Sequence, residues 1–187
     1  MNDSTNIKVA GFGGQGVMMF GQILAYSATN DELYGLWFPS YGPETRGGTA
    51  NCSVIISKKT INSPVFQKAN HVIAFNAPSL EKFKDKIKEN GLILYNSSLV
   101  KEHISSDQGV CIGVPINDIA AELGSMQVAN MVMMGAYLEL TNLFSDQTIQ
   151  KILHKFLGEK KAHMVDINME AIQRGKDYIK DSGVTYA

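Results

Sequence analysis

Two glycine-rich segments carry residues whose types and spacing could bind a ligand. The first, Gly11-Phe12-Gly13-Gly14-Gln15-Gly16, separates a short apolar run from a stretch with helical periodicity. A glycine turn between a strand and a helix gathers free backbone N–H groups at the positive end of the helix, where an anion such as phosphate can bind. The second segment, residues 40–48, contains Glu44, Thr45 and Arg46, and a guanidinium group can fork onto a carboxylate or phosphate.

The first segment also satisfies the dinucleotide-binding pattern G-x-G-x-x-G with Gly11, Gly13 and Gly16. Dinucleotide folds normally add an acidic residue about twenty positions further on to hold the ribose. Residues 36–38 occupy that region and are all apolar, so an NAD site lacks its second anchor. Two other interpretations stay open: the glycines allow close packing of helix on sheet, or the turn meets another phosphate-bearing group or a partner's backbone. Arg46 could equally pair with Glu44 or cap a helix.

Composition limits the class of protein. The chain has 187 residues, 44% of them hydrophobic, and a net charge of −1 without a basic block, so we expect one domain over residues 1–187 and no nucleic-acid partner. Its two cysteines, Cys52 and Cys111, cannot supply the four thiolates of an iron–sulfur cluster. The four histidines show no metal-ligand spacing, and no catalytic residue stands out. Residues 126–144 are too polar for a membrane span and no secretory signal is visible, so we expect a cytoplasmic location.

The elements that must position the two segments follow from periodicity and turn residues. We expect strands at residues 7–10, 33–38, 49–57, 71–75, 92–95 and 110–114, and a hairpin or edge turn at 58–60. We expect helices at residues 16–29, 77–89, 118–123, 127–142, 146–157 and 168–180, with a short helical piece at 65–69. Strands that alternate with helices predict an α/β fold: three layers, a mostly parallel sheet with helices on both faces, and a candidate antiparallel strand. The loops after the first two strands would then share one rim.

Three motifs together resemble a known family. They are Gly-Phe-Gly-Gly-Gln-Gly at 11–16, Pro-Ser-Tyr-Gly-Pro-Glu-Thr-Arg-Gly-Gly-Thr-Ala-Asn-Cys at 39–52 and Asn-Ser-Pro at 62–64. In order and spacing they are similar to the gamma subunit of 2-oxoacid:ferredoxin oxidoreductases. The resemblance extends over most of the chain and is densest in residues 7–80. The version at 46–52 looks closer to the 2-oxoglutarate and branched-chain 2-oxoacid enzymes than to the pyruvate enzymes, with 2-oxoglutarate favoured.

The resemblance implies an accessory role in an enzyme complex. Such complexes oxidatively decarboxylate a 2-oxoacid to its acyl-CoA with thiamine diphosphate, and pass electrons through iron–sulfur clusters to ferredoxin. The thiamine and cluster sites belong to other subunits, so the resemblance assigns no cofactor to this chain alone. It does imply that the chain helps to shape the CoA site. Its expected partners are alpha and beta subunits, with a delta subunit as a further candidate, and ferredoxin indirectly. The residues carried over as cofactor contacts are Gly11, Gly13, Gly14, Gln15, Gly16, Glu44, Thr45, Arg46, Gly47, Gly48 and Asn51.

Two questions remain open from the sequence. The helix expected at 127–142 is apolar on nearly every side, so it is either central to the core or covered by a partner. An isolated gamma chain could also form a homodimer through apolar surface meant for its partners. The alternative function is a free-standing nucleotide-binding α/β protein that uses the same glycine turn.

Overall fold

The computed structural model describes residues 4–40 and 49–186 of the chain. Its strands are β1 (Ser4–Phe12), β2 (Tyr34–Ser40), β3 (Thr49–Ser57), β4 (Ala69–Ala74), β5 (Ile87–Asn96) and β6 (Gly109–Val114). Its α-helices are α1 (Val17–Asn30), α2 (Ala77–Phe83), α3 (Ile116–Glu122), α4 (Ala129–Thr141), α5 (Asp146–Leu157) and α6 (Met164–Ser182). Short 3₁₀ helices cover Met126–Val128 and Glu159–Lys161.

The six strands form one sheet in the order β2-β3-β1-β4-β5-β6. The pairs β1–β4, β4–β5 and β5–β6 are parallel, whereas β3 runs antiparallel to both β1 and β2. The sheet is therefore mostly parallel with one reversed strand, which confirms the predicted α/β class. Of the two alternatives expected at 58–60, a hairpin or an edge turn, the hairpin is wrong, because β3 pairs with β1 and β2 and not with the strand that follows it.

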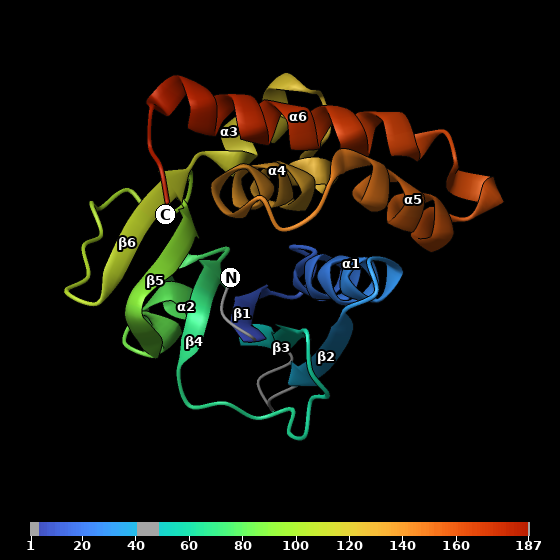
Figure 1. The fold of residues 1–187 in the computed structure, drawn as a ribbon. Helices are drawn as coiled ribbons and strands as arrows, with labels where there is room; N and C mark the ends of the chain where they lie inside the picture. Colours follow the sequence, from blue (N-terminus) through green and yellow to red (C-terminus); the bar gives the residue numbers. More distant parts are fainter. Residues whose placement is uncertain (1–3, 41–48, 187) are drawn as a thin grey trace.

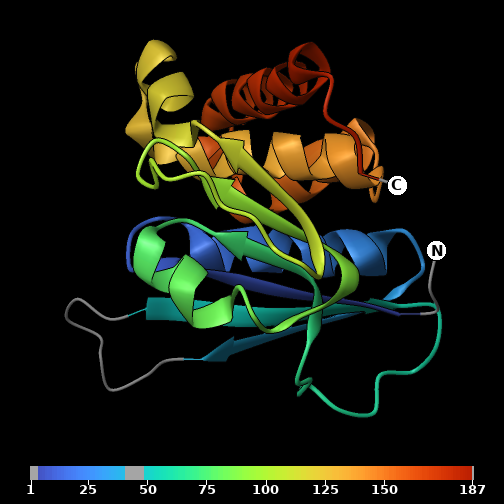
Figure 2. The same ribbon diagram turned by 90° about the vertical axis from the view of Figure 1, so that its left-hand side faces the viewer.

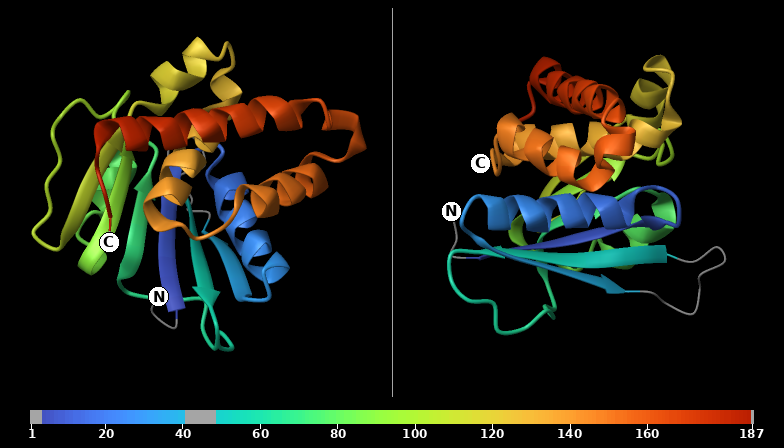
Figure 3. Two further views of the ribbon diagram at one scale, coloured as in Figure 1. Left: turned by 45° about the horizontal axis from the view of Figure 1, so that its top comes forward. Right: turned by 90° about the vertical axis from the view of Figure 1, so that its right-hand side faces the viewer.

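Helices cover both faces of the sheet, as predicted. On the first face α1 packs on β1, β2 and β3, and α4 lies between the sheet and α6 (Figure 1). On the second face the short helix α2 covers β1 and β4 with its own smaller apolar cluster, which includes Leu80, Phe83 and Ile87 (Figure 2). The long α6 runs across the outside of α4 and is the outermost layer in both views of Figure 3. The first face thus holds the main core.

The helix α4 belongs to the core. Met131, Met133 and Met134 are fully buried, and the side chains of residues 130–138 are all buried. A Cβ at Gly135 would collide with the carbonyl of Ile172 on α6, and one at Gly175 with the carbonyl of Val132 on α4. The glycines therefore let the two helices touch backbone to backbone, which explains why every side of α4 is apolar. Met126, ahead of the helix, is the exposed methionine of this group.

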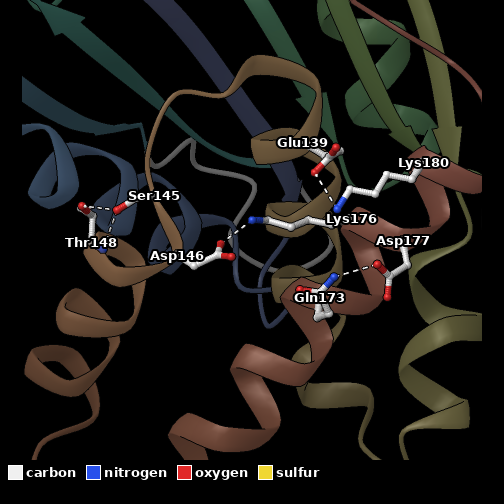
Figure 4. Close-up of polar contacts among 8 residues, drawn as sticks. All are labelled: Glu139, Ser145, Asp146, Thr148, Gln173, Lys176, Asp177 and Lys180. Atoms are coloured by element: carbon white, nitrogen blue, oxygen red, sulfur yellow. Dashed lines mark hydrogen bonds and ion pairs between the residues drawn. The ribbon is translucent and has the colours of Figure 1, made fainter.

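Polar contacts fix α6 and α5 around α4. Lys176 of α6 pairs with Asp146 at the start of α5, and Lys180 lies 3.6 Å from Glu139 of α4 (Figure 4). The hydroxyl of Ser145 accepts a 3.2 Å hydrogen bond from the backbone N–H of Thr148, and so caps α5. These contacts orient the three helices, whereas the buried side chains of α4 supply its apolar contact with the core.

One predicted helix is absent, and another starts where expected but is too long. Residues 65–69 form no helix, and Ala69 begins β4. The helix expected at 77–89 ends at Phe83, and Ile87 begins β5. Asn90, the residue after the expected end of that helix, instead lies inside β5 with a positive φ of 57°. The fully buried Ile87 packs with Leu80 and Phe83 from a strand, so the apolar spacing does not require one continuous helix.

A buried histidine joins β4 to the helices. A 2.8 Å hydrogen bond links Nδ1 of His71 to the hydroxyl of Tyr137 on α4, and the hydroxyl of Tyr186 lies 3.4 Å from Nε2. Both tyrosine rings contact the imidazole edge to face. Burial lowers the pKa of His71 from 6.5 to about 4, because the charged imidazolium would lose its hydration. The imidazole is therefore neutral at pH 7.

This lowered pKa predicts a pH-dependent stability. Between pH 6.5 and 4 the unfolded chain binds a proton that folded His71 does not, so the free energy of unfolding falls as the pH falls through that window. At pH 5 the loss for this group is on the order of 2 kcal/mol relative to pH 7. Urea unfolding at both pH values should show a smaller pH dependence for His71→Gln than for the unchanged chain. His154→Gln, at an exposed position, is the control. A pH dependence in His71→Gln equal to that of the unchanged chain would contradict the prediction.

Candidate ligand-binding site at the glycine turn

The predicted strand–turn–helix is present at the carboxyl end of β1. Gly14 and Gly16 have φ values of 90° and 77°, a left-handed conformation that glycine adopts without strain. Gly16 precedes α1, and no side chain caps this helix. Within the described residues, no hydrogen-bond acceptor receives the backbone N–H groups of Val17 or Met18. The turn thus leaves donors free at the positive end of α1.

Gln15 ties the turn to the neighbouring strand. Its Oε1 accepts hydrogen bonds from the backbone N–H of Phe12 at 2.7 Å and from Nδ2 of Asn76 at 2.8 Å. Its Nε2 donates to the carbonyl of Phe75 at 3.4 Å. Gln15 was expected to contact a cofactor, and that contact stays a prediction; in the structure its carboxamide makes hydrogen bonds to three protein groups. Its place in the structure is that of a residue that positions the turn.

Three asparagines extend this network, and the sequence pattern alone does not single them out. Asn76 follows β4 and caps α2 by accepting from the N–H of Ser79 at 3.0 Å. Asn96, fully buried at the end of β5, donates from Nδ2 to the Phe75 carbonyl at 3.2 Å and to Oδ1 of Asn117 at 3.0 Å. The one available signal is that asparagine stands at or just after the end of β4, β5 and β6.

The glycines of the turn have different roles. A Cβ on Gly11 would lie 2.7 Å from Cγ2 of Val17 and 2.8 Å from Oε1 of Gln15, so this glycine allows close packing. A Cβ on Gly16 would overlap the side chain of Asn130, which lies in the first turn of α4. Gly13 has open space where its Cβ would be. Close packing therefore explains Gly11 and Gly16 and leaves Gly13 facing free space.

The structure describes only part of the second predicted segment and of the residues beside it. Glu44, Thr45, Arg46, Gly47 and Gly48 lie outside the described residues. Asn51 lies on β3 opposite Ala10, next to the end of β1. Its Oδ1 is 3.4 Å from Nζ of Lys8, which also donates to Oγ of Ser53 at 2.6 Å on the second face of the sheet. Asn51 is thus close to the turn in the sheet, with its side chain on the face opposite to α1.

Cys52, the next residue, faces α1. Its Sγ donates to the carbonyl of Val17 at 3.7 Å, and the indole of Trp37 lies beside it against Gly21. Burial raises the pKa of the Cys52 thiol to about 12, so it remains protonated at neutral pH. A protonated, fully buried thiol is a packing residue and not a nucleophile.

Over residues 4–40 and 49–186, no group of three or more His, Cys, Asp or Glu side chains is arranged to hold a metal ion. Among the same residues, no helix combines the length and the apolar character needed to span a membrane.

Comparison with known proteins extends this picture. Residues 6–178 match the model of the family described as pyruvate ferredoxin/flavodoxin oxidoreductase. The chain is 36% identical to the ketoisovalerate oxidoreductase subunit VorA of Methanothermobacter thermautotrophicus, over 94% of this chain but only 36% of that protein. It is 33% identical to the 2-oxoglutarate synthase subunit KorC of Methanocaldococcus jannaschii, over 94% of each.

Two solved structures have the same fold. One is the gamma subunit of a keto/oxoacid ferredoxin oxidoreductase from Geobacter sulfurreducens, with a TM-score of 0.80 and 28% identity over 95% of this chain and 99% of that one. The other is the 2-oxoglutarate:ferredoxin oxidoreductase of Magnetococcus marinus with 2-oxoglutarate, coenzyme A and succinyl-CoA bound. It has a TM-score of 0.89 and 28% identity over all of this chain and 32% of that one. The chain thus spans about a third of some relatives and nearly the whole of others.

The amide network should hold the turn in place. Gln15→Met keeps the size of the side chain but leaves the Phe12 N–H and the Asn76 amide without their acceptor. Unpaired buried donors destabilise a fold, so we expect a loss of about 2 kcal/mol in the free energy of unfolding, measured in urea. Gln67→Met, at an exposed position, is the matched control and should change stability by less than about 0.5 kcal/mol. Equal effects of the two substitutions would show that the network does not support the turn.

Proposed function

Because the chain belongs to the pyruvate ferredoxin/flavodoxin oxidoreductase family, we propose that it is the gamma subunit of a 2-oxoacid:ferredoxin oxidoreductase. The observation that carries the proposal is the match to KorC, a subunit of which 94% of the length corresponds to this chain. The complex would convert a 2-oxoacid and CoA to an acyl-CoA and carbon dioxide, and deliver the electrons to ferredoxin. In this proposal the subunit is accessory and inactive alone.

The partners of the subunit would carry the redox chemistry. An iron–sulfur cluster needs four thiolates, and the whole sequence has two cysteines. Cys52 lies on β3 and Cys111 on β6, at well-separated positions in the sheet order. The clusters would therefore reside on alpha and beta subunits, with a delta subunit as a further candidate, and in this proposal thiamine diphosphate does so too. Ferredoxin would contact the complex rather than this chain, in the cytoplasm.

This chain would contribute to the binding of CoA. The free N–H groups at the start of α1 fit a phosphate of that cofactor, which carries several. The proposed contact region is the one expected from the sequence, namely the turn at residues 11–16 together with 44–48 and Asn51. Gln15 would act in this region by positioning the turn.

Two 2-oxoacids are candidates for the substrate of the complex. We favour 2-oxoglutarate, because KorC and the Magnetococcus enzyme are both named for it. Ketoisovalerate is the second candidate, because VorA shares 36% identity with the chain. None of the relatives described above is named as a free-standing nucleotide-binding protein. A homodimer of the isolated chain also remains a proposal.

Co-purification provides the test. A tagged chain, expressed with the alpha and beta candidates encoded beside it, should purify as a complex that reduces methyl viologen when given CoA and a 2-oxoacid. The isolated chain should show no activity. Parallel assays with 2-oxoglutarate, ketoisovalerate and pyruvate would identify the substrate through the highest kcat/KM. Activity of the isolated chain, or failure of every companion subunit to bind it, would refute the proposal.

A further inference from the structure

One half of the second face of the sheet carries no helix. Helix α2 packs on β1 and β4 on that face, whereas α1 packs on β2 and β3 from the first face. Figure 2 shows α1 on one side of β2 and β3 and, among the described residues, no helix on the other side. A three-layer fold normally covers both faces of its sheet, so this half is where another chain could add the missing layer.

Apolar side chains line this uncovered half. On β2 the side chains of Tyr34, Leu36 and Phe38 point to the second face, because Gly35 and Trp37 between them face α1. Tyr34 is 50% exposed and Phe38 is 45% exposed, and Leu36 is half-buried. Neighbouring exposed apolar side chains are typical of sites where proteins contact one another.

Lys8 places a positive charge beside this apolar row. The strand register aligns Phe38 with Ser53 and Ser53 with Lys8, so the three side chains lie on the same face of the sheet. Nζ of Lys8 donates to Oγ of Ser53 at 2.6 Å and lies 3.4 Å from Oδ1 of Asn51. It also lies 5.4 Å from the centre of the Phe83 ring. These groups are all neutral, so they compensate only in part for the hydration that the ammonium group loses.

Lys8 takes part in none of the ion pairs among residues 4–40 and 49–186. A second ammonium group, that of Lys86, lies 5.4 Å from the same Phe83 ring. Burial lowers the pKa of Lys8, and the positive charges of Lys86 and Lys82 lower it further. A carboxylate next to Lys8 would act in the opposite direction and stabilise the charged form. The partly buried cation is therefore complementary to a negative group from outside this chain.

We propose that Lys8, Ser53, Tyr34, Leu36 and Phe38 form a docking surface for a companion subunit, which packs an apolar segment on β2 and places one carboxylate on Lys8. The proposal deepens the proposed function and rests on it for the existence of such a subunit. The apolar row would supply most of the buried area. The ion pair would fix which aspartate or glutamate of the companion lies opposite the ammonium group.

A companion subunit fits this surface better than a second copy of the chain or a small anion. In a two-fold symmetric dimer the surface would face itself, so Lys8 would approach a surface whose five residues include no carboxylate. A small anion could pair with Lys8 but would leave the rings of Tyr34 and Phe38 exposed to water. A protein segment with one acidic residue among apolar ones matches both parts of the surface.

Zero-length cross-linking of the assembled complex tests the contact directly. A carbodiimide couples an amine to a carboxylate only where the two groups touch. We expect mass spectrometry to find a peptide in which Lys8 is joined by an amide bond to an aspartate or glutamate of an alpha or beta subunit. Lys84 and Glu81, whose Nζ and Oε2 are 2.8 Å apart, provide the internal control for the coupling reaction.

Substitutions measure how much the surface contributes to assembly. Lys8→Met removes the charge and keeps an unbranched apolar side chain, so the Kd for the companion subunits should rise at least about tenfold. The thermal midpoint of the isolated chain should stay the same or rise, because methionine needs no hydration. Lys8→Arg keeps the charge and should lose less affinity. Phe38→Ser should also weaken binding, because it removes an exposed ring from the apolar row. Lys151→Met, at an exposed position on α5, is the matched control and should change neither quantity.

Three results would overturn the proposal. The first is that Lys8→Met binds the companion subunits as tightly as the unchanged chain does, with no cross-link at Lys8. The second is a Lys8 cross-link to another copy of this chain only. The third is a Lys8→Met complex that assembles normally but has a raised KM for CoA, since Lys8 would then serve an anion. In all three the unchanged chain still joins its companions, so the proposed function stands. If no companion binds the unchanged chain, both proposals fall.

Discussion

The backbone carbonyl of Phe75 is the point on which the candidate site depends. It lies at the end of β4 and accepts hydrogen bonds from Gln15 on one side and from Asn96 on the other. Through these two amides the ends of β1, β4 and β5 are joined, and α1 follows the first of them in the chain. Hydrogen bonds in a buried network are stronger than in water, and each is costly to leave unmade. The position of the α1 N-terminus is therefore set by contacts among the ends of three strands, and not by the glycine turn alone.

Much of the fold could be predicted from the sequence, because local signals and tertiary packing agree. The bounds of β3 and α5 follow from a β-branched run and from a serine cap before an amphipathic stretch. The prediction failed where one pattern fits two structures. Leu80, Phe83 and Ile87 have helical spacing, but a seven-residue helix followed by a turn and a strand brings the same side chains together. The pairing of β5 with β4 decides between the two, and that contact is not local.

The site could be predicted in outline and not in its chemistry. The glycine turn has a sequence pattern, so its strand–turn–helix context was accessible. The sequence does not single out Asn76, Asn96 and Asn117 as part of the site, because asparagine after a strand is also an ordinary turn residue. Asn130 was still harder to recognise, since it looks like one polar interruption in an apolar helix. Its side chain packs against Gly16, which lies more than a hundred positions away in the chain, and a Cβ on that glycine would overlap it.

The same residues limit what this chain can do in a reaction. Gly11–Gly16 and Asn130 contain no titratable side chain, and the nearby Cys52 remains protonated because burial raises its pKa to about 12. His71 is neutral at pH 7 and enclosed by Tyr137 and Tyr186. In the proposed function the described residues of the site would therefore bind and orient a ligand, and among them there is no general acid or base. Binding energy at a remote part of a substrate can still accelerate a reaction, because it holds the reacting group in place for residues elsewhere. An accessory subunit that binds the distal part of a cofactor needs donors of this kind and no catalytic group of its own.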